Sequence, residues 1–204
     1  MNEAPNTLQK EGQPKNSQRQ DAQLEIFPIS SLIRFTLLSL YLALVLPLPA
    51  LAPASLRLQL SLALLVGLLG LVSALSEQVR TSEADLSVGY PLWCAWGLRR
   101  GWRIRWNELN ALVPIRTSQG GTVFYLQTKQ LNHQLLPQRI EQFEQCLQQI
   151  QDRGGIDTTK VGRLTPAWTY QLLLGLSVLM LVGEGLTALS IWKGWIALPA
   201  GYGI

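Results

Sequence analysis

The sequence predicts an α+β membrane protein. A transmembrane helical hairpin should precede a small antiparallel β-barrel or sandwich with a C-terminal helix, and a third transmembrane helix should follow. Only 15% of the 204 residues are charged, and these lie mostly outside three long apolar runs. Each run is close to the roughly twenty residues that a helix needs to cross about 30 Å of hydrocarbon. The polar block between the second and third runs has the alternating pattern of strands.

The first two apolar runs predict the hairpin over residues 29–75. Phe35–Ala52 and Leu58–Leu75 carry no charge and are separated by a short turn. Pro47 lies near the end of the first run, where a proline kinks or ends a helix. Two buried helices in a soluble protein are the alternative, but no matching amphipathic helices occur elsewhere. Residues 1–28 are rich in Gln, Asn, Pro and Lys and are expected to form a disordered polar tail.

The central block, residues 76–165, predicts several antiparallel strands followed by one helix. Apolar residues alternate with polar or small ones in Leu86–Tyr90 and in Trp102–Trp106. Pro114 indicates an edge strand or a bulge, and the glycine pair Gly120–Gly121 indicates a hairpin turn. From Ile140 to about Asp152 the apolar residues have helical spacing, and a second glycine pair should end that helix.

Five short motifs in this block carry a resemblance. They are Ser82-Glu83-Ala84-Asp85-Leu86, Arg99-Arg100-Gly101-Trp102, Trp106-Asn107-Glu108-Leu109, Gly120-Gly121 and Leu135-Leu136-Pro137. Taken together, they resemble bacterial pleckstrin-homology-like domains. In such folds one end of the barrel binds phosphoinositides or protein segments.

The order of hairpin, domain and third span also looks like that of uncharacterised membrane proteins of cyanobacteria and chloroplasts. That resemblance implies a thylakoid or plasma membrane and a role in building or stabilising photosynthetic complexes. Cyanobacteria lack an obvious phosphoinositide system, so a protein partner is favoured over a phosphoinositide.

The third span is predicted over residues 166–192, followed by a short tail over 193–204. Ala167–Gly183 is uncharged, and the apolar character resumes after Glu184. A charge inside a span is costly, so Glu184 is expected to contact another helix or water. The alternative is that the helix ends near Gly183 and leaves Glu184 at the far interface.

The distribution of basic residues predicts the orientation. Eleven of the 17 Lys and Arg residues lie between Arg80 and Arg163, and four lie in the first 34 residues. The positive-inside rule therefore places the tail and the central domain on the cytoplasmic or stromal side.

The stretch Tyr90–Trp106 holds four of the seven tryptophans and four arginines. Arg103 and Arg105 should form the solvated face of a strand whose other face is core. An apolar loop precedes them, and beside a bilayer it could rest among anionic headgroups. Packing of this loop into the core is the alternative. The residues expected to contact lipid or a partner are Leu92, Trp93, Trp96, Arg99 and Arg100.

Catalytic and metal-binding motifs do not stand out. Cys94 and Cys146 form no C-x-x-C pair and are expected to be buried thiols without a chemical role. A disulfide between them is the alternative. The single histidine, His133, is expected to be incidental. We therefore expect no enzyme, no cofactor, no metal and no nucleic acid, and instead a membrane-anchored adaptor for a membrane protein complex. The alternative is an oligomeric transporter or ion-handling component that uses Glu184.

Overall fold

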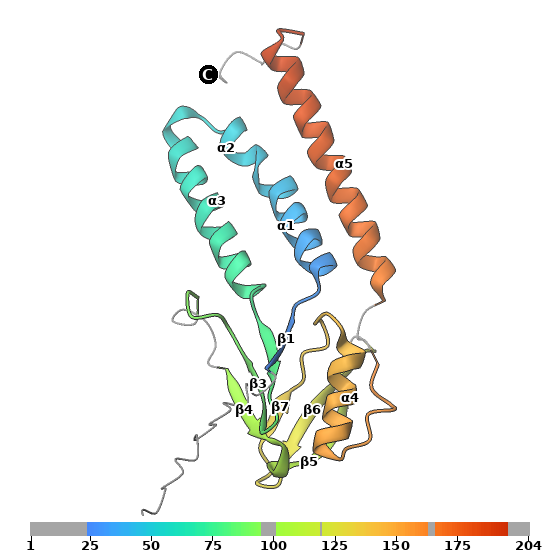
Figure 1. Cartoon of the computed structure of the whole chain (residues 1–204). Coiled ribbons are helices and arrows are strands. Elements are labelled where there is room, and N and C mark those ends of the chain that lie inside the picture. Colours follow the sequence, from blue (N-terminus) through green and yellow to red (C-terminus); the bar gives the residue numbers. More distant parts are fainter. Residues whose placement is uncertain (1–23, 95–100, 119, 163–165, 196–204) are drawn as a thin grey trace, which may run out of the picture.

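The computed structural model describes residues 24–94, 101–118, 120–162 and 166–195. Long apolar helices occupy one end of the molecule, and two antiparallel sheets with an amphipathic helix occupy the other (Figure 1).

The apolar end consists of α1 (Ser31–Val45), α2 (Pro47–Leu51), α3 (Ala54–Ala74) and α5 (Ala167–Trp192). Three helical stretches in the described chain, with α1 and α2 counted as one, are long and apolar enough to cross a membrane. The first stretch breaks before α2 because Pro47 has no backbone N–H to donate to the carbonyl one turn earlier. The three expected apolar helices and the break at Pro47 are thereby confirmed.

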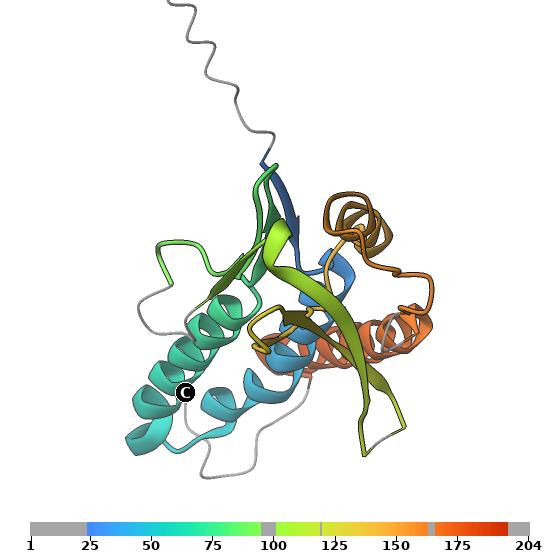
Figure 2. The ribbon, with the colours of Figure 1, turned by 90° about the horizontal axis from the view of Figure 1, so that it is seen from below.

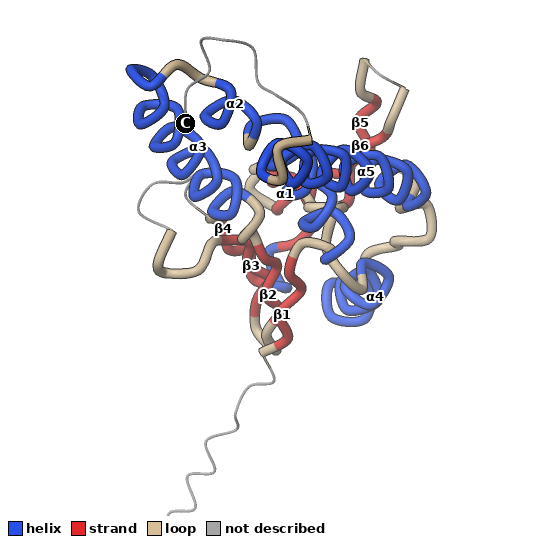
Figure 3. The backbone as a smooth tube through the Cα atoms, turned by 90° about the horizontal axis from the view of Figure 1, so that it is seen from above, coloured by secondary structure: helices blue, strands red, loops and turns tan. Residues whose placement is uncertain are grey.

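Helix α1 contacts both α3 and α5, and it lies beside α5 in the views from the side and from above (Figures 1 and 3). Polar atoms join α1 to each neighbour. The Ser39 and Ser177 hydroxyls lie 2.7 Å apart across the contact with α5. On the other side, the Tyr41 hydroxyl donates to the Leu64 carbonyl of α3 at 2.9 Å. The first and last apolar helices of the chain therefore form a pair.

A four-stranded antiparallel sheet follows the order of the chain: β1 (Glu25–Pro28), β2 (Gln78–Thr81), β3 (Asp85–Gly89) and β4 (Trp102–Arg105). Strand β1 pairs with β2 along its whole length. The helical hairpin is therefore inserted into the turn between two paired strands. The polar tail expected over residues 1–28 ends earlier than predicted, because Phe27 is only 2% exposed and belongs to the core.

A three-stranded sheet contains β5 (Leu109–Arg116), β6 (Thr122–Thr128) and β7 (His133–Leu135), and a short 3-10 helix, η1 (Trp106–Glu108), leads into it. Strand β5 is an edge strand with a register shift near its start, and both features agree with the expectation from Pro114. Gly120 has a φ of 82°, which suits the predicted hairpin turn. The hairpin of β5 and β6 projects away from the rest of the molecule (Figure 2).

Helix α4 (Phe143–Gly154) ends at the expected glycine pair, with Gly155 in the left-handed conformation. It begins later than predicted, because Ile140 forms an isolated bridge with Ile29. Both sheets and α4 share one core, so the predicted inward face of the strands is confirmed. Its buried residues are Phe27, Val79, Leu86, Val88, Ile104, Trp106, Leu109, Phe124, Leu126, Leu136, Ile140, Phe143, Cys146, Leu147, Ile150 and Val161.

Candidate functional site

The loop after β3 carries the apolar residues expected to contact lipid or a partner. Leu92 is 94% exposed and Trp93 is 55% exposed, so neither side chain packs in the core. They sit on a short turn in which the Cys94 amide donates to the Pro91 carbonyl at 3.1 Å. The loop lies beside the sheet-proximal end of α3 (Figures 1 and 2). What these side chains contact stays a prediction.

The other members of the expected contact surface, Trp96, Arg99 and Arg100, lie outside the described residues. The strand that follows agrees with the sequence. Arg103 and Arg105 are exposed, whereas Ile104 between them is buried. These two arginines form the solvated face of β4.

A joint between the sheet domain and α1 was not predicted. The chain between β1 and α1 runs beside residues 139–141, which precede α4. The Ser30 amide donates to the Arg139 carbonyl, and the Glu141 amide donates to the Pro28 carbonyl, each at 2.8 Å. These bonds fix the direction in which α1 leaves the sheet domain.

Glu141 completes this joint by capping α1. Its carboxylate accepts hydrogen bonds from the Ser31 amide at 2.8 Å and from the Ser31 hydroxyl. A carboxylate at a helix N-terminus satisfies otherwise unpaired amides and complements the helix dipole. The Ser31 hydrogen bonds, with a contribution from the charge of Arg34, lower the pKa of Glu141 from its ordinary value.

Local sequence gave only a weak signal for this joint. The β-forming residues Ile26, Phe27 and Ile29 precede the serine pair that starts α1, which is consistent with a short strand. The partner segment lies 110 residues further along the chain. The spacing of residues in the sequence could not show that these two segments lie side by side.

Glu184 lies within a continuous helix, because α5 extends to Trp192. The alternative in which the helix ends near Gly183 is therefore wrong. Glu184 lies seven residues beyond the buried Ser177, on the same stripe of α5 that faces α1. Its Oε2 atom is buried and has no hydrogen-bond partner among the described residues. With a rise of 1.5 Å per residue, Glu184 is about 12 Å from the end of α5.

The glycines on either side of Glu184 do not pack against the rest of the chain. A side chain added at Gly183 or Gly185 would meet no described atom within 4 Å. The helix surface at the two glycines that flank Glu184 is therefore not covered by described residues. Glu184 itself is on the α1-facing side of α5, and the expected contact of the two flanking glycines with another helix stays a prediction.

The remaining candidate residues are the two cysteines and the single histidine. Cys94 and Cys146 are both free and buried, as expected, and burial raises the pKa of the Cys146 thiol to about 12. A thiol with that pKa is not a nucleophile at neutral pH. His133 lies on β7, 3.2 Å from the Gln127 amide nitrogen. No group of three or more potential metal ligands occurs within the described ranges.

No protein-family model and no solved structure matches the chain. The chain is 38% identical over 186 residues to "Uncharacterized protein slr0269" of Synechocystis sp. (strain ATCC 27184 / PCC 6803 / Kazusa). The match covers 88% of this chain and 93% of the relative. A cyanobacterial relative was expected from the resemblance in the sequence, and the match confirms that part of it.

Proposed function

The chain belongs to the family of the cyanobacterial protein slr0269, and from this premise we propose that it is a non-enzymatic adaptor anchored in a membrane by three helices. The sheet domain holds or orients a membrane protein complex on the cytoplasmic or stromal side. The complex is a photosynthetic one in the thylakoid membrane, for which the protein serves as an assembly factor or auxiliary subunit. The plasma membrane is the alternative location.

The observation that carries this proposal is the joint between the domain and the membrane helices. Strands β1 and β2 flank the hairpin and pair with each other, and Glu141, from the segment before α4, caps α1. A domain tied at both strands cannot swing freely about the bilayer. A fixed orientation suits a protein that positions a partner, whereas a flexibly tethered catalytic module needs no such joint.

The sheet domain is proposed to be pleckstrin-homology-like. Its four-stranded and three-stranded antiparallel sheets, followed by one amphipathic helix, support that assignment. The exposed Leu92 and Trp93, beside the membrane end of the domain, are the residues proposed to touch lipid or the partner.

Co-purification tests the adaptor proposal. Tagged full-length protein, extracted in mild detergent, should retain the subunits of one membrane complex when analysed by mass spectrometry. Leu92→Ala/Trp93→Ala should weaken that retention, whereas Arg116→Gln, on the distant β5–β6 hairpin, should not. Recovery of no complex from either protein would contradict the proposal.

Protease access tests the proposed orientation. In sealed vesicles, protease added on the cytoplasmic or stromal side should cut the N-terminal tail and the domain, and should leave the C-terminus protected. The positive-inside rule is the physical basis of this expectation. A domain that is cut only from the opposite side would reverse the orientation.

Glu184 favours a second candidate, an oligomeric transporter or ion-handling component. Its buried Oε2 lacks a partner in the described chain, and intramembrane acids often mark ion pathways. In that case Glu184→Gln should abolish proton or ion flux in proteoliposomes. For the adaptor, the same variant should still insert and show weaker retention on the partner complex, with no flux in either protein.

A further inference from the structure

The outer face of the four-stranded sheet carries two arginines on either side of a serine. In the strand register Arg80 of β2 pairs with Ser87 of β3, and Ser87 pairs with Arg103 of β4. Neighbouring strands are about 4.8 Å apart, so the backbones that carry the two arginines are about 10 Å apart. All three residues line a shallow pocket of about 260 Å³.

The base of this pocket is formed in part by two glycines, which have no side chains to fill it. Gly89 and Gly101 lie where β3 and β4 approach each other, and both line the pocket. A side chain added at Gly101 would collide with the Val88 carbonyl and with the Gly89 backbone. The side-chain-free floor lets a ligand reach the space between the two arginines.

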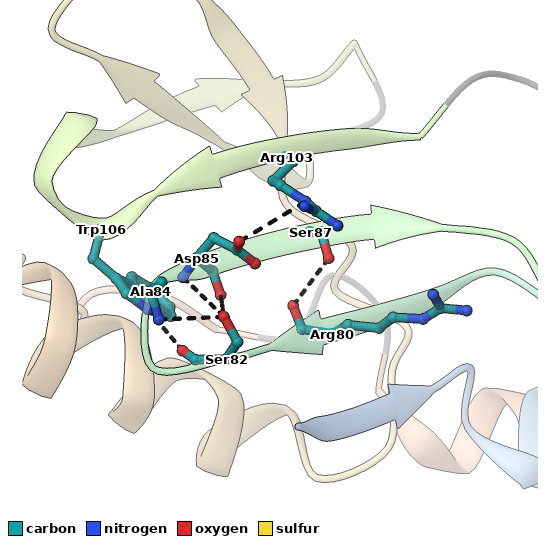
Figure 4. A network of polar contacts seen from close by, with 7 residues as sticks. All are labelled: Arg80, Ser82, Ala84, Asp85, Ser87, Arg103 and Trp106. Carbon is teal, nitrogen blue, oxygen red and sulfur yellow. Dashed lines mark hydrogen bonds and ion pairs between the residues drawn. The ribbon is translucent and has the colours of Figure 1, made fainter. Parts of the chain in front are cut away.

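The polar groups of the pocket have few charged partners among the described residues (Figure 4). Arg103 contacts Asp85 through Nε at 3.9 Å, a distance typical of a loose ion pair. The Ser87 hydroxyl donates to the Arg80 carbonyl at 3.4 Å, which is long for a hydrogen bond. Arg80 donates from Nε to the neutral Gln78 amide oxygen at 2.8 Å, in the amide orientation that satisfies both groups.

The charge of the pocket is therefore positive. Asp85 offsets part of the charge of Arg103, whereas Arg80 donates to a neutral amide and forms no ion pair with an acidic side chain among the described residues. Two guanidinium groups and one hydroxyl group can together donate hydrogen bonds to the oxygens of a phosphate. Each guanidinium offers planar, forked N–H donors, which match the geometry of phosphate oxygens.

The pocket also faces the membrane end of the domain. Both guanidinium groups extend toward the end of the sheet at which β1 leads into α1 (Figure 4). Strand β2 begins shortly after α3 ends at Ala74, and β3 leads into the loop with Leu92 and Trp93. A membrane crossed by α1 and α3 would therefore place its headgroups near this pocket.

We propose that Arg80, Ser87 and Arg103 bind the phosphate of an anionic phospholipid headgroup. The proposal rests on the membrane insertion proposed above, and it adds a headgroup-phosphate site outside the exposed Leu92–Trp93 loop. The headgroup phosphate would sit between the arginines over the glycine floor, with its acyl chains directed toward α3. Bound lipid would thus fix the height of the sheet domain at the bilayer surface.

Native mass spectrometry of the full-length protein in detergent tests the site. The probes are phosphatidylglycerol, which is anionic, and phosphatidylcholine, which has no net charge. Wild-type protein should retain phosphatidylglycerol preferentially. Arg80→Gln/Arg103→Gln should reduce that affinity, by about fivefold for each arginine lost. Arg105→Gln/Arg116→Gln removes the same charge outside the pocket and should leave the preference nearly unchanged.

Three results would overturn the proposal. These are an equal loss in both double variants, an absence of preference for phosphatidylglycerol in the wild type, or displacement of the lipid by inorganic phosphate at equal concentration. The last result would assign the pocket to a free phosphate instead. Extraction of the wild-type protein from membranes by alkaline carbonate would instead overturn the proposed membrane insertion, and with it the lipid as the source of the anion.

Discussion

Glu141 illustrates how one carboxylate can join two distant parts of this chain. It lies just before α4, yet it accepts hydrogen bonds from the first residue of α1. The two residues are 110 positions apart, so the cap forms only in the folded protein. Because α1 starts at this cap, the carboxylate contributes to both the stability of the helix and its direction.

Glu141→Ala should lower the stability of the folded protein by about 1 kcal/mol, as the loss of a helix cap does. The measurement is thermal unfolding of the full chain in detergent. Glu83→Gln, at an exposed position in the turn between β2 and β3, is the control and should behave like the wild type. Equal melting temperatures for Glu141→Ala and the wild type would contradict the capping role.

The stabilisation by Glu141 should also depend on pH. The hydrogen bonds from Ser31 lower the pKa of the folded carboxyl below its ordinary value of 4.5. The stabilisation is therefore fully present above that ordinary value and is lost as the pH falls through the folded pKa. The difference in melting temperature between wild type and Glu141→Gln should shrink as the pH is lowered below about 4.5. A difference that is constant from pH 7 to pH 3 would argue against this linkage.

Two tryptophans should respond in opposite ways to the same substitution. Trp106 is buried, and its Nε1 donates to the Ser82 carbonyl at 2.9 Å, so Trp106→Ala should cost about 3–5 kcal/mol. Trp93 is largely exposed, so Trp93→Ala should leave thermal unfolding nearly unchanged and should weaken binding to anionic liposomes or to the partner. A collapse of stability in Trp93→Ala would instead assign Trp93 to the core.

At the scale of elements, polar contacts specify the pairing of α1 with α5. Leucine-rich surfaces are nearly equivalent in lipid, so small and polar residues decide which helices approach closely. Ser177 is fully buried against α1, and the buried Thr36 donates to the Tyr170 carbonyl at 3.2 Å. Helix α3 has no buried residue, so most of its surface is left uncovered by the rest of the described chain.

A disulfide should form across this helix pair. The hydroxyl oxygens of Ser39 and Ser177 are 2.7 Å apart, so Ser39→Cys/Ser177→Cys places two thiols within reach of each other. With a protease site introduced into the 156–162 segment, the two fragments should stay linked on a non-reducing gel. Ser61→Cys/Ser177→Cys is the control, because Ser61 lies on α3. Cross-linking in the control alone would contradict the α1–α5 pair.

At the scale of the whole molecule, the apolar helical hairpin interrupts a β-hairpin. Strand β1 contributes Phe27 to a core that otherwise comes from residues after the helical hairpin. The sheet domain is therefore not the contiguous segment 76–165, and its folding depends on pairing strands that lie about fifty residues apart. The same arrangement connects the domain to the apolar helices at two points.

This arrangement predicts the behaviour of two shortened proteins. Residues 24–30 joined to 77–162 by a short glycine-containing turn should give a soluble, cooperatively folded domain, because the turn restores the β1–β2 hairpin. Residues 76–162 alone lack Phe27 and should be less stable by about 3–5 kcal/mol, as for a buried aromatic cut to alanine. Chemical denaturation of both proteins measures the difference. Equal stabilities would show that β1 is dispensable.

The sequence by itself determined the local elements of this protein. Apolar runs of membrane-spanning length predicted the long helices, because length and hydropathy are local properties. The alternation around Ile104, the turn at Gly120 and the end of α4 at a glycine pair were predicted for the same reason. The exposed arginines of β4 followed from that alternation.

Only the tertiary structure decided which distant segments meet. Strand β1 is four residues long, and a strand that short gains its stability from partners rather than from its own pattern. Its pairing with β2, the cap by Glu141, the contact of Ser39 with Ser177 and the flanking of Ser87 by Arg80 and Arg103 all require the folded chain. Long-range pairing depends on shared burial and complementary hydrogen bonding, which a linear sequence does not encode by spacing.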